Sequence, residues 1–136
     1  HYSDHLDWFR EIRRRPDTVI FAIRRTHDAA LIGSCQLHSI SAIHRSAELQ
    51  IRIGEREDRG KGYGTEAVKL LLAHAYRDLN LHRVQVHVFS ANPPALRLYE
   101  TVGFKREGVL RNAVVIDGRS LDVLVMSILS SEYTLS

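Results

Sequence analysis

The chain has 136 residues, of which 44% are hydrophobic and 26% charged, and this composition is typical of one globular domain rather than a disordered or fibrous segment. Its net charge of +3 comes mostly from scattered bases, so we expect no nucleic-acid partner. No apolar run approaches the roughly 20 residues that cross a bilayer, and no signal peptide is recognisable. We therefore expect a soluble, cytoplasmic protein with no membrane partner.

Cysteine and histidine patterns exclude two further kinds of site. The single cysteine, Cys35, cannot form an internal disulfide, and its apolar alternating surroundings favour a packed thiol over a nucleophile. The eight histidines match no metal-binding spacing such as His-Glu-x-x-His. We expect no metal.

The first half of the chain is predicted to be a helix followed by strands. Apolar residues recur at helical spacing from Asp4 to Arg15, and Pro16 ends that helix. Short segments rich in β-branched residues then predict a hairpin and a third strand: residues 18–24, 30–40 and 47–54. Strict alternation in the third strand gives it one polar face: Glu48, Gln50 and Arg52.

The second half alternates between helical and strand patterns. Residues 62–78 have an apolar stripe at helical spacing, and residues 82–89 alternate as a strand. Asn92 is a good N-cap for a short helix that Gly103 ends. The chain closes with two strands joined by a turn at Asp117-Gly118: residues 105–115 and 120–129.

This order of elements predicts a single domain over residues 1–136 with an α/β (α+β) fold. The sheet is expected to be mixed and mostly antiparallel, with helices on both faces. Its one parallel pair comes from the central crossover, in which residues 62–78 connect the strands 47–54 and 82–89.

The stretch Arg59-Gly60-Lys61-Gly62-Tyr63-Gly64-Thr65 joins the third strand to the long helix. Its glycines leave backbone amides uncovered at a helix N-terminus, where the helix dipole and two basic side chains favour a phosphate or pyrophosphate. The same stretch could be a plain turn. It matches neither a P-loop, because Lys61 precedes Gly62, nor a dinucleotide fingerprint, because no acid closes the strand that ends at Phe89.

The spacing Arg59-x-x-Gly62-x-Gly64 resembles the pyrophosphate-binding turn of the GNAT superfamily of acyl-CoA-dependent N-acetyltransferases. A second match follows about thirty residues later: Asn92-x-x-Ala95-x-x-x-Tyr99, then Val102-Gly103-Phe104. The run from Gly60 to Ala67, with residues 107–111, is similar to the branch of ribosomal-protein N-terminal and polyamine acetyltransferases. Members usually open with a strand before their first helix, so the first strand of the fold is expected to be missing.

The resemblance implies an N-acetyltransferase that moves the acetyl group of acetyl-CoA directly to a primary amine. The acceptor would be a peptide N-terminus, an amino sugar or a polyamine, and the scarcity of acids other than Glu48 near the thioester slightly disfavours polyamines. A homodimer is also expected. Two alternatives remain open: a non-catalytic acyl-CoA sensor or interaction module, and an RNA-binding domain suggested by the basic pI.

The resemblance also implies the site residues. Amides of the Gly-rich turn hold the pyrophosphate, and an amide beside a bulge in the third strand polarises the thioester. The residues expected to bind acetyl-CoA are Ile53, Gly54, Arg59, Gly60, Lys61, Gly62, Tyr63, Gly64, Thr65, Asn92 and Ala95. Glu48 is the candidate base, with His87 as an alternative, and the Tyr99 hydroxyl would protonate the thiolate. By periodicity alone Tyr99 would be a core residue, and Glu48 could merely pair with a neighbouring base.

Overall fold

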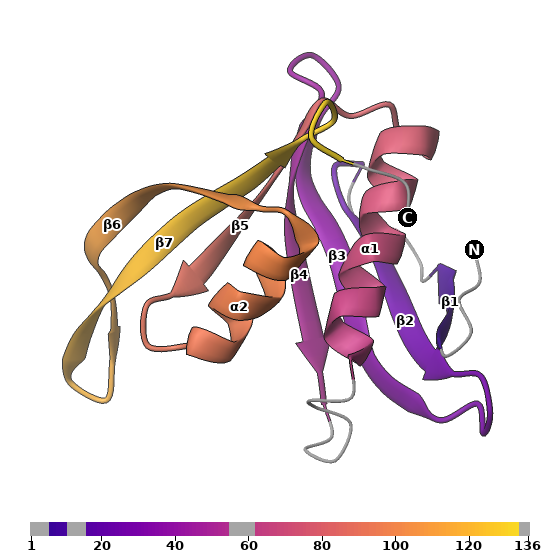
Figure 1. The fold of residues 1–136 in the computed structure, drawn as a ribbon, viewed down its shortest axis with the longest axis horizontal. Helices are drawn as coiled ribbons and strands as arrows, with labels where there is room; N and C mark the ends of the chain where they lie inside the picture. The colour runs from indigo at the N-terminus through magenta and orange to yellow at the C-terminus, as the bar shows by residue number, and fades with distance from the viewer. Residues whose placement is uncertain (1–5, 11–15, 55–61, 134–136) are drawn as a thin grey trace.

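The computed structural model describes residues 6–10, 16–54 and 62–133. These form a sheet of seven strands in the order β1-β2-β3-β4-β5-β7-β6 (Figure 1). The strands are β1 (Leu6–Arg10), β2 (Val19–Arg25), β3 (Leu31–Ser41), β4 (Ser46–Ile53), β5 (Arg83–Phe89), β6 (Lys105–Ile116) and β7 (Arg119–Leu129). The helices are α1 (Tyr63–Ala73), the π-helical turn η2 (His74–Asp78) and α2 (Pro93–Val102). No described helix is long and apolar enough to cross a membrane.

The N-terminal segment contains a strand where the spacing of apolar residues predicts a helix. Strand β1 pairs antiparallel with β2, from Leu6 opposite Arg25 to Arg10 opposite Phe21. The prediction of a helix from Asp4 to Arg15 is therefore wrong for residues 6–10, and the rest of that range lies outside the described residues. Adjacent aromatic residues favour a strand, and pairing with the edge of β2 satisfies backbone groups that local spacing ignores.

The other predicted elements form close to their expected positions. Pairs β1–β2, β2–β3, β3–β4, β5–β7 and β6–β7 are antiparallel, and β4 and β5 form the predicted parallel pair. The β6–β7 turn has positive φ at both Asp117 and Gly118, as a tight hairpin turn requires. The sheet is thus mixed and mostly antiparallel, as predicted.

Both helices lie on the same face of the sheet, in front of it in Figure 1. Helix α1 buries Val68, Leu71 and Leu72 against the strands. Gly103, at the end of α2, approaches Ile128 on that same face. Among the described residues helices lie on this face alone, and part of the segment expected to form a helix on the other face lies outside the described residues. The opposite face of β3, β4 and β5 carries polar side chains.

Candidate active site

Strands β4 and β5 separate after a short paired stretch. Their parallel pairing covers three residue pairs and ends where Glu48 lies opposite Gln85. Beyond that point β4 continues to Ile53 and β5 to Phe89. Edges that diverge leave backbone groups facing the gap, where a ligand can supply their hydrogen bonds. This V-shaped gap is the opening of the candidate site.

A cavity of about 850 Å³ lies at the open end of the gap. It is lined by the end of β4, the N-terminus of α1 and α2 with its cap. Six of the residues predicted to bind acetyl-CoA line this cavity: Ile53, Gly62, Gly64, Thr65, Asn92 and Ala95. The predicted Arg59, Gly60 and Lys61 lie outside the described residues. Tyr63 packs against the core, part-buried.

The N-terminus of α1 presents free backbone amides beside this cavity. Gly62 caps the helix with φ of +82°, a conformation that favours glycine. The Glu66 amide donates to the Gly62 carbonyl at 3.0 Å and is the first amide bonded within the helix. The amides of residues 63–65 precede it, so they have no partner within the helix. Together with the helix dipole they favour an anion.

Close packing brings α2 up to this helix terminus. A Cβ on Gly64 would lie 2.7 Å from Leu98 Cδ1, so glycine permits the contact between α1 and α2. The Asn92 side chain accepts a hydrogen bond from the Ala95 amide at 3.3 Å and caps α2. Gly64 and Asn92, which the sequence motifs single out, thus have a packing and a capping role as well as a position on the cavity wall.

The amide directions along β4 follow from its pairing with β3. The Gly54 amide donates to the Ile32 carbonyl at 2.7 Å, so the prediction that Gly54 binds the thioester finds no support. Pairing with β3 is regular from Glu48 to Ile53, without the implied bulge. Because successive amides point to opposite sides of a strand, the Ile51 amide faces the gap. Ile51 also lines the cavity and was not predicted.

Glu48 lies at the vertex of the gap and is surrounded by hydrogen-bonding groups. Its Oε1 is 2.8 Å from His87 Nδ1 and accepts from Gln85 Nε2 at 3.3 Å. Its Oε2 is 3.1 Å from His38 Nε2. The structure therefore brings together the predicted Glu48 and His87. It adds His38, which the sequence does not single out because its position opposite Glu48 depends on the register of β3 and β4.

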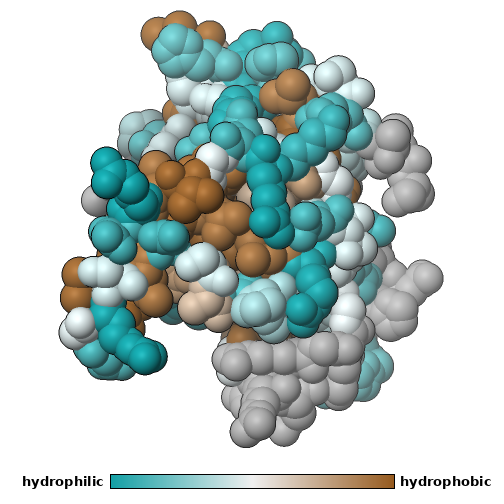
Figure 2. Space-filling view, turned by 60° about the vertical axis from the view of Figure 1, so that its left-hand side comes forward, coloured by the Kyte–Doolittle hydropathy of each residue, from teal (hydrophilic) through white to brown (hydrophobic). Residues whose placement is uncertain are grey.

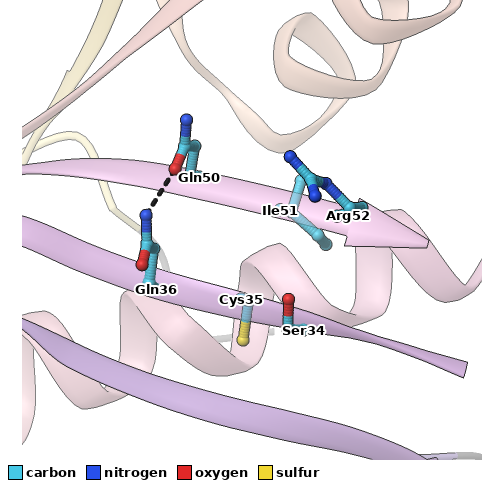
Figure 3. Close-up of a pocket in the computed structure, with 6 residues that line it drawn as sticks. All are labelled: Ser34, Cys35, Gln36, Gln50, Ile51 and Arg52. Atoms are coloured by element: carbon cyan, nitrogen blue, oxygen red, sulfur yellow. Dashed lines mark hydrogen bonds between the residues drawn. The ribbon is translucent and has the colours of Figure 1, made fainter. Parts of the chain in front are cut away.

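The polar face continues on both sides of this cluster. Toward the sheet edge, Arg83 donates one hydrogen bond to Gln85 at 2.9 Å and another to Glu107. The hydrogen bond from Arg83 lowers the pKa of Glu107. Toward the open end, a second cavity of about 230 Å³ lies over β3 and β4, where Gln36 donates to Gln50 (Figure 3). Arg52 borders both cavities.

Cys35 is packed, as predicted. Its side chain points away from the polar side chains in Figure 3 and belongs to the core. Burial raises the pKa of its thiol to about 12. Among the described residues, no group of three or more His, Cys, Asp or Glu side chains is arranged to hold a metal ion.

Tyr99 lies on the buried side of α2. Its residue surface is 7% exposed, its ring meets Phe104 edge-on at 5.3 Å between centroids, and burial raises its pKa to about 12. No described residue forms a hydrogen bond with its hydroxyl. Tyr99 thus belongs to the core, as its periodicity predicts. A phenol that stays protonated at neutral pH can donate a proton or a hydrogen bond, so the acid role remains a prediction.

The sequence and the fold are similar to those of known proteins. A profile of the acetyltransferase (GNAT) domain matches residues 2–105. The chain belongs to the GNAT acetyltransferase family. The spermidine N(1)-acetyltransferase of Vibrio cholerae is 45% identical over 103 residues, which are 76% of this chain and 59% of that protein. The putative ribosomal N-acetyltransferase YdaF of Bacillus subtilis is 31% identical over 107 residues, 79% of this chain and 58% of that protein.

A solved structure of the GNAT family supports the same arrangement. The spermidine N-acetyltransferase of V. cholerae, in complex with CoA and spermine, superimposes with a TM-score of 0.82 at 40% identity, over 87% of this chain and 69% of that chain. The superfamily and branch inferred from the sequence are thus confirmed. The chain spans about three fifths of the length of the curated GNAT relatives it matches.

Proposed function

We propose that this protein is an N-acetyltransferase that moves the acetyl group of acetyl-CoA directly to a primary amine. The observation that carries the proposal is the V-shaped gap between β4 and β5, with the cavity at its open end and Glu48 at its vertex. An elongated thioester can enter from the cavity, and its reactive end then meets a polar, proton-accepting group. Family membership supports the same chemistry.

Acetyl-CoA would bind along the gap. Its pyrophosphate would bind the amides of residues 63–65 at the start of α1, with Arg59 and Lys61 adding charge. Its pantetheine arm would lie against β4 and the start of α2, near Asn92 and Ala95. The Ile51 amide, which faces the gap, joins the Ile53 amide as a candidate donor to the thioester carbonyl in place of Gly54. In other acyl transfers such a donor lowers the activation free energy by about 3 kcal/mol.

The reaction requires three proton movements. An alkylammonium loses one proton so that its nitrogen can attack the acetyl carbon. The N–C bond forms, the C–S bond breaks, and the nitrogen loses a second proton. One proton ends on the departing sulfur, for which Tyr99 is the candidate donor, and the other is released to solvent. Glu48 with its histidines is the candidate acceptor of the first proton.

The acceptor class is a small amine, with spermidine as the first candidate. The relative at 45% identity and the solved structure with CoA and spermine are both spermidine acetyltransferases. This outweighs the slight preference against polyamines that the scarcity of acids suggested. A peptide N-terminus is the second candidate, because a putative ribosomal N-acetyltransferase is also similar. The homodimer stays a prediction, which light scattering would test.

A thiol-release assay tests the proposal. The protein, acetyl-CoA and one amine at a time are mixed: spermidine, a panel of peptides and an amino sugar. We expect CoA release above hydrolysis with spermidine. If acetyl-CoA binds and no amine accelerates CoA release, the acyl-CoA sensor replaces the enzyme. Salt-sensitive RNA binding without acetyl-CoA binding would instead favour the RNA-binding domain.

A further inference from the structure

We propose that His87, rather than Glu48, takes the proton from the amine, and that Glu48 and His38 position it. This inference rests on the proposed acetyl transfer and assigns the proton acceptor within it. The carrying observation is a row of three side chains from three adjacent strands, in which one carboxylate lies between two imidazoles.

The two histidines differ in what their second nitrogen does. His38 contacts Glu48 through Nε2 and Ser39 Oγ through Nδ1, at 3.2 Å, so both of its nitrogens are engaged. His87 contacts Glu48 through Nδ1 at 2.8 Å, and no described residue bonds its Nε2. When Nδ1 carries the hydrogen donated to the carboxylate, Nε2 of a neutral imidazole is a proton acceptor. His87 therefore presents a free basic nitrogen, and His38 does not.

The Glu48 carboxylate has less room for a substrate. Its Oε1 already faces both His87 and Gln85, and its Oε2 faces His38. Three of its roughly four lone-pair sites are thus occupied by protein groups. A carboxylate held in this way orients an imidazole and stabilises the imidazolium that forms, which is the role of the third member in triad chemistry.

His87 lies where an incoming amine would meet the thioester. It is two residues beyond Gln85, the last residue of β5 that pairs with β4, so it stands just inside the gap. Its side chain is 37% exposed, against 26% for His38 and 22% for Glu48. The helices cover the other face of the sheet, so an amine can approach His87 from the polar face while acetyl-CoA enters beside α1 and α2.

The electrostatic surroundings of His87 come from five strands. The carboxylate of Glu48 on β4 and the imidazole of His38 on β3 are nearest, and Arg83 lies on β5. Strand β7 places Val125 opposite His87. On β6, Glu107 is paired with Arg83 and Lys105 with Glu132. Glu48 is therefore the described carboxylate placed to balance a positive charge on His87.

In the proposed step one proton moves from the alkylammonium to His87 and later to solvent. The alkylammonium gives one proton to His87 Nε2, its nitrogen keeps the electron pair, and that pair attacks the acetyl carbon. The imidazolium is paired with the Glu48 carboxylate and returns its proton to solvent after the C–S bond breaks. An amine that is already neutral at the assay pH needs no such acceptor before attack.

This difference gives the experiment. Initial rates with acetyl-CoA are measured for the wild type, His87→Gln, Glu48→Gln, His38→Gln and a control, His27→Gln, which changes an exposed histidine in the β2–β3 turn. Each is assayed against an ordinary alkylamine and against a fluorinated ethylamine whose ammonium deprotonates below the assay pH. Acetyl-CoA binding and thermal stability are measured for every variant, so that a folding defect is recognised.

We expect His87→Gln to lose about 100-fold in kcat/KM with the alkylamine and to lose little with the fluorinated amine. Glu48→Gln and His38→Gln should lose less than His87→Gln with the alkylamine and, like it, little with the fluorinated amine. In an additional variant, His87→Ala, added imidazole should restore part of the activity. The inference is overturned if Glu48→Gln loses kcat/KM with the alkylamine but not with the fluorinated amine, while His87→Gln has the same rates as the control His27→Gln. A wild type without turnover on any amine would instead refute the proposed function.

Discussion

Gly33 tests whether the end of β4 is held where the site needs it. This glycine lies in β3 opposite Ile53, and a Cβ added to it would lie 2.0 Å from the Arg52 carbonyl oxygen. That is 1.0 Å closer than the 3.0 Å that Cβ atoms normally keep, and the obstructing atom belongs to the backbone. Gly33→Ala must therefore push β3 and β4 apart at this end.

The expected cost follows from two losses. Overpacking against a fixed backbone costs about 2 kcal/mol, and weakening the neighbouring hydrogen bond from the Gly54 amide to Ile32 adds about 1 kcal/mol. A total of about 3 kcal/mol lowers the urea midpoint by about 1.5 M at a typical slope of unfolding. Because Ile51 and Ile53 line the cavity, a shift of about 1 Å should also lower kcat/KM for acetyl-CoA by at least about tenfold.

Gly108 supplies the matched control. It is also a strand glycine, and a Cβ there would meet no atom within 4 Å. Gly108→Ala should change the free energy of unfolding by no more than about 0.5 kcal/mol. Equal midpoints for the two variants and the wild type would refute the close approach of β3 and β4 and the placement of the cavity wall derived from it.

Three further predictions concern single side chains. Tyr99→Phe should lower kcat by about tenfold or more with little change in acetyl-CoA binding, and unchanged turnover would return Tyr99 to a core role. Cys35, whose pKa is raised to about 12, should react with a thiol reagent at pH 8 at least about 100-fold more slowly in the folded than in the urea-unfolded protein; rapid labelling without unfolding would contradict its burial. The pKa of Glu107 is lower in the folded than in the unfolded protein, where it is near 4.5. This difference stabilises the folded state at pH values above 4.5, and the stabilisation is lost as the pH falls through the folded pKa. Glu107→Gln should therefore narrow the difference in unfolding free energy between pH 7 and pH 3, and an unchanged difference would show that its ion pair with Arg83 contributes nothing.

Most of the fold could be predicted because local signals and tertiary structure agree. Alternation in β4 and β5, the Asn92 cap and the Asp117-Gly118 turn each need only neighbouring residues, and each forms as expected. The N-terminal segment could not be predicted in this way. Its helical spacing competes with pairing to β2, and that pairing partner lies about ten to twenty residues away in the sequence.

The candidate site also has parts that local sequence predicts and parts that depend on strand pairing. The Gly-rich turn and the Asn92 motif are each a contiguous stretch of sequence, so each can be recognised from its own spacing. Described residues of both line one cavity. His38 and the Ile51 amide depend instead on the register of β3 against β4 and on where β4 leaves β5. The sequence does not display either quantity, so the proton acceptor and the carbonyl donor stay predictions.

The surface near β6 and β7 is mixed in polarity. Several large apolar side chains are exposed beyond the helices, and Figure 2 shows apolar atoms gathered beside polar ones on the side where β6 and β7 lie. They include Phe89 on β5 and Val109, Leu110, Val115 and Ile116 on β6. This surface carries no readable acceptor code, so the choice of amine requires the amine panel.

The most direct test of acetyl transfer is mass spectrometry of a quenched reaction with isotope-labelled acetyl-CoA and spermidine. Direct attack by the amine predicts that the label appears on spermidine in equal amount to the CoA released, and that no labelled acetyl group is covalently attached to the protein at any time. Label accumulating on the protein, or CoA released without acetylated amine, would contradict the account.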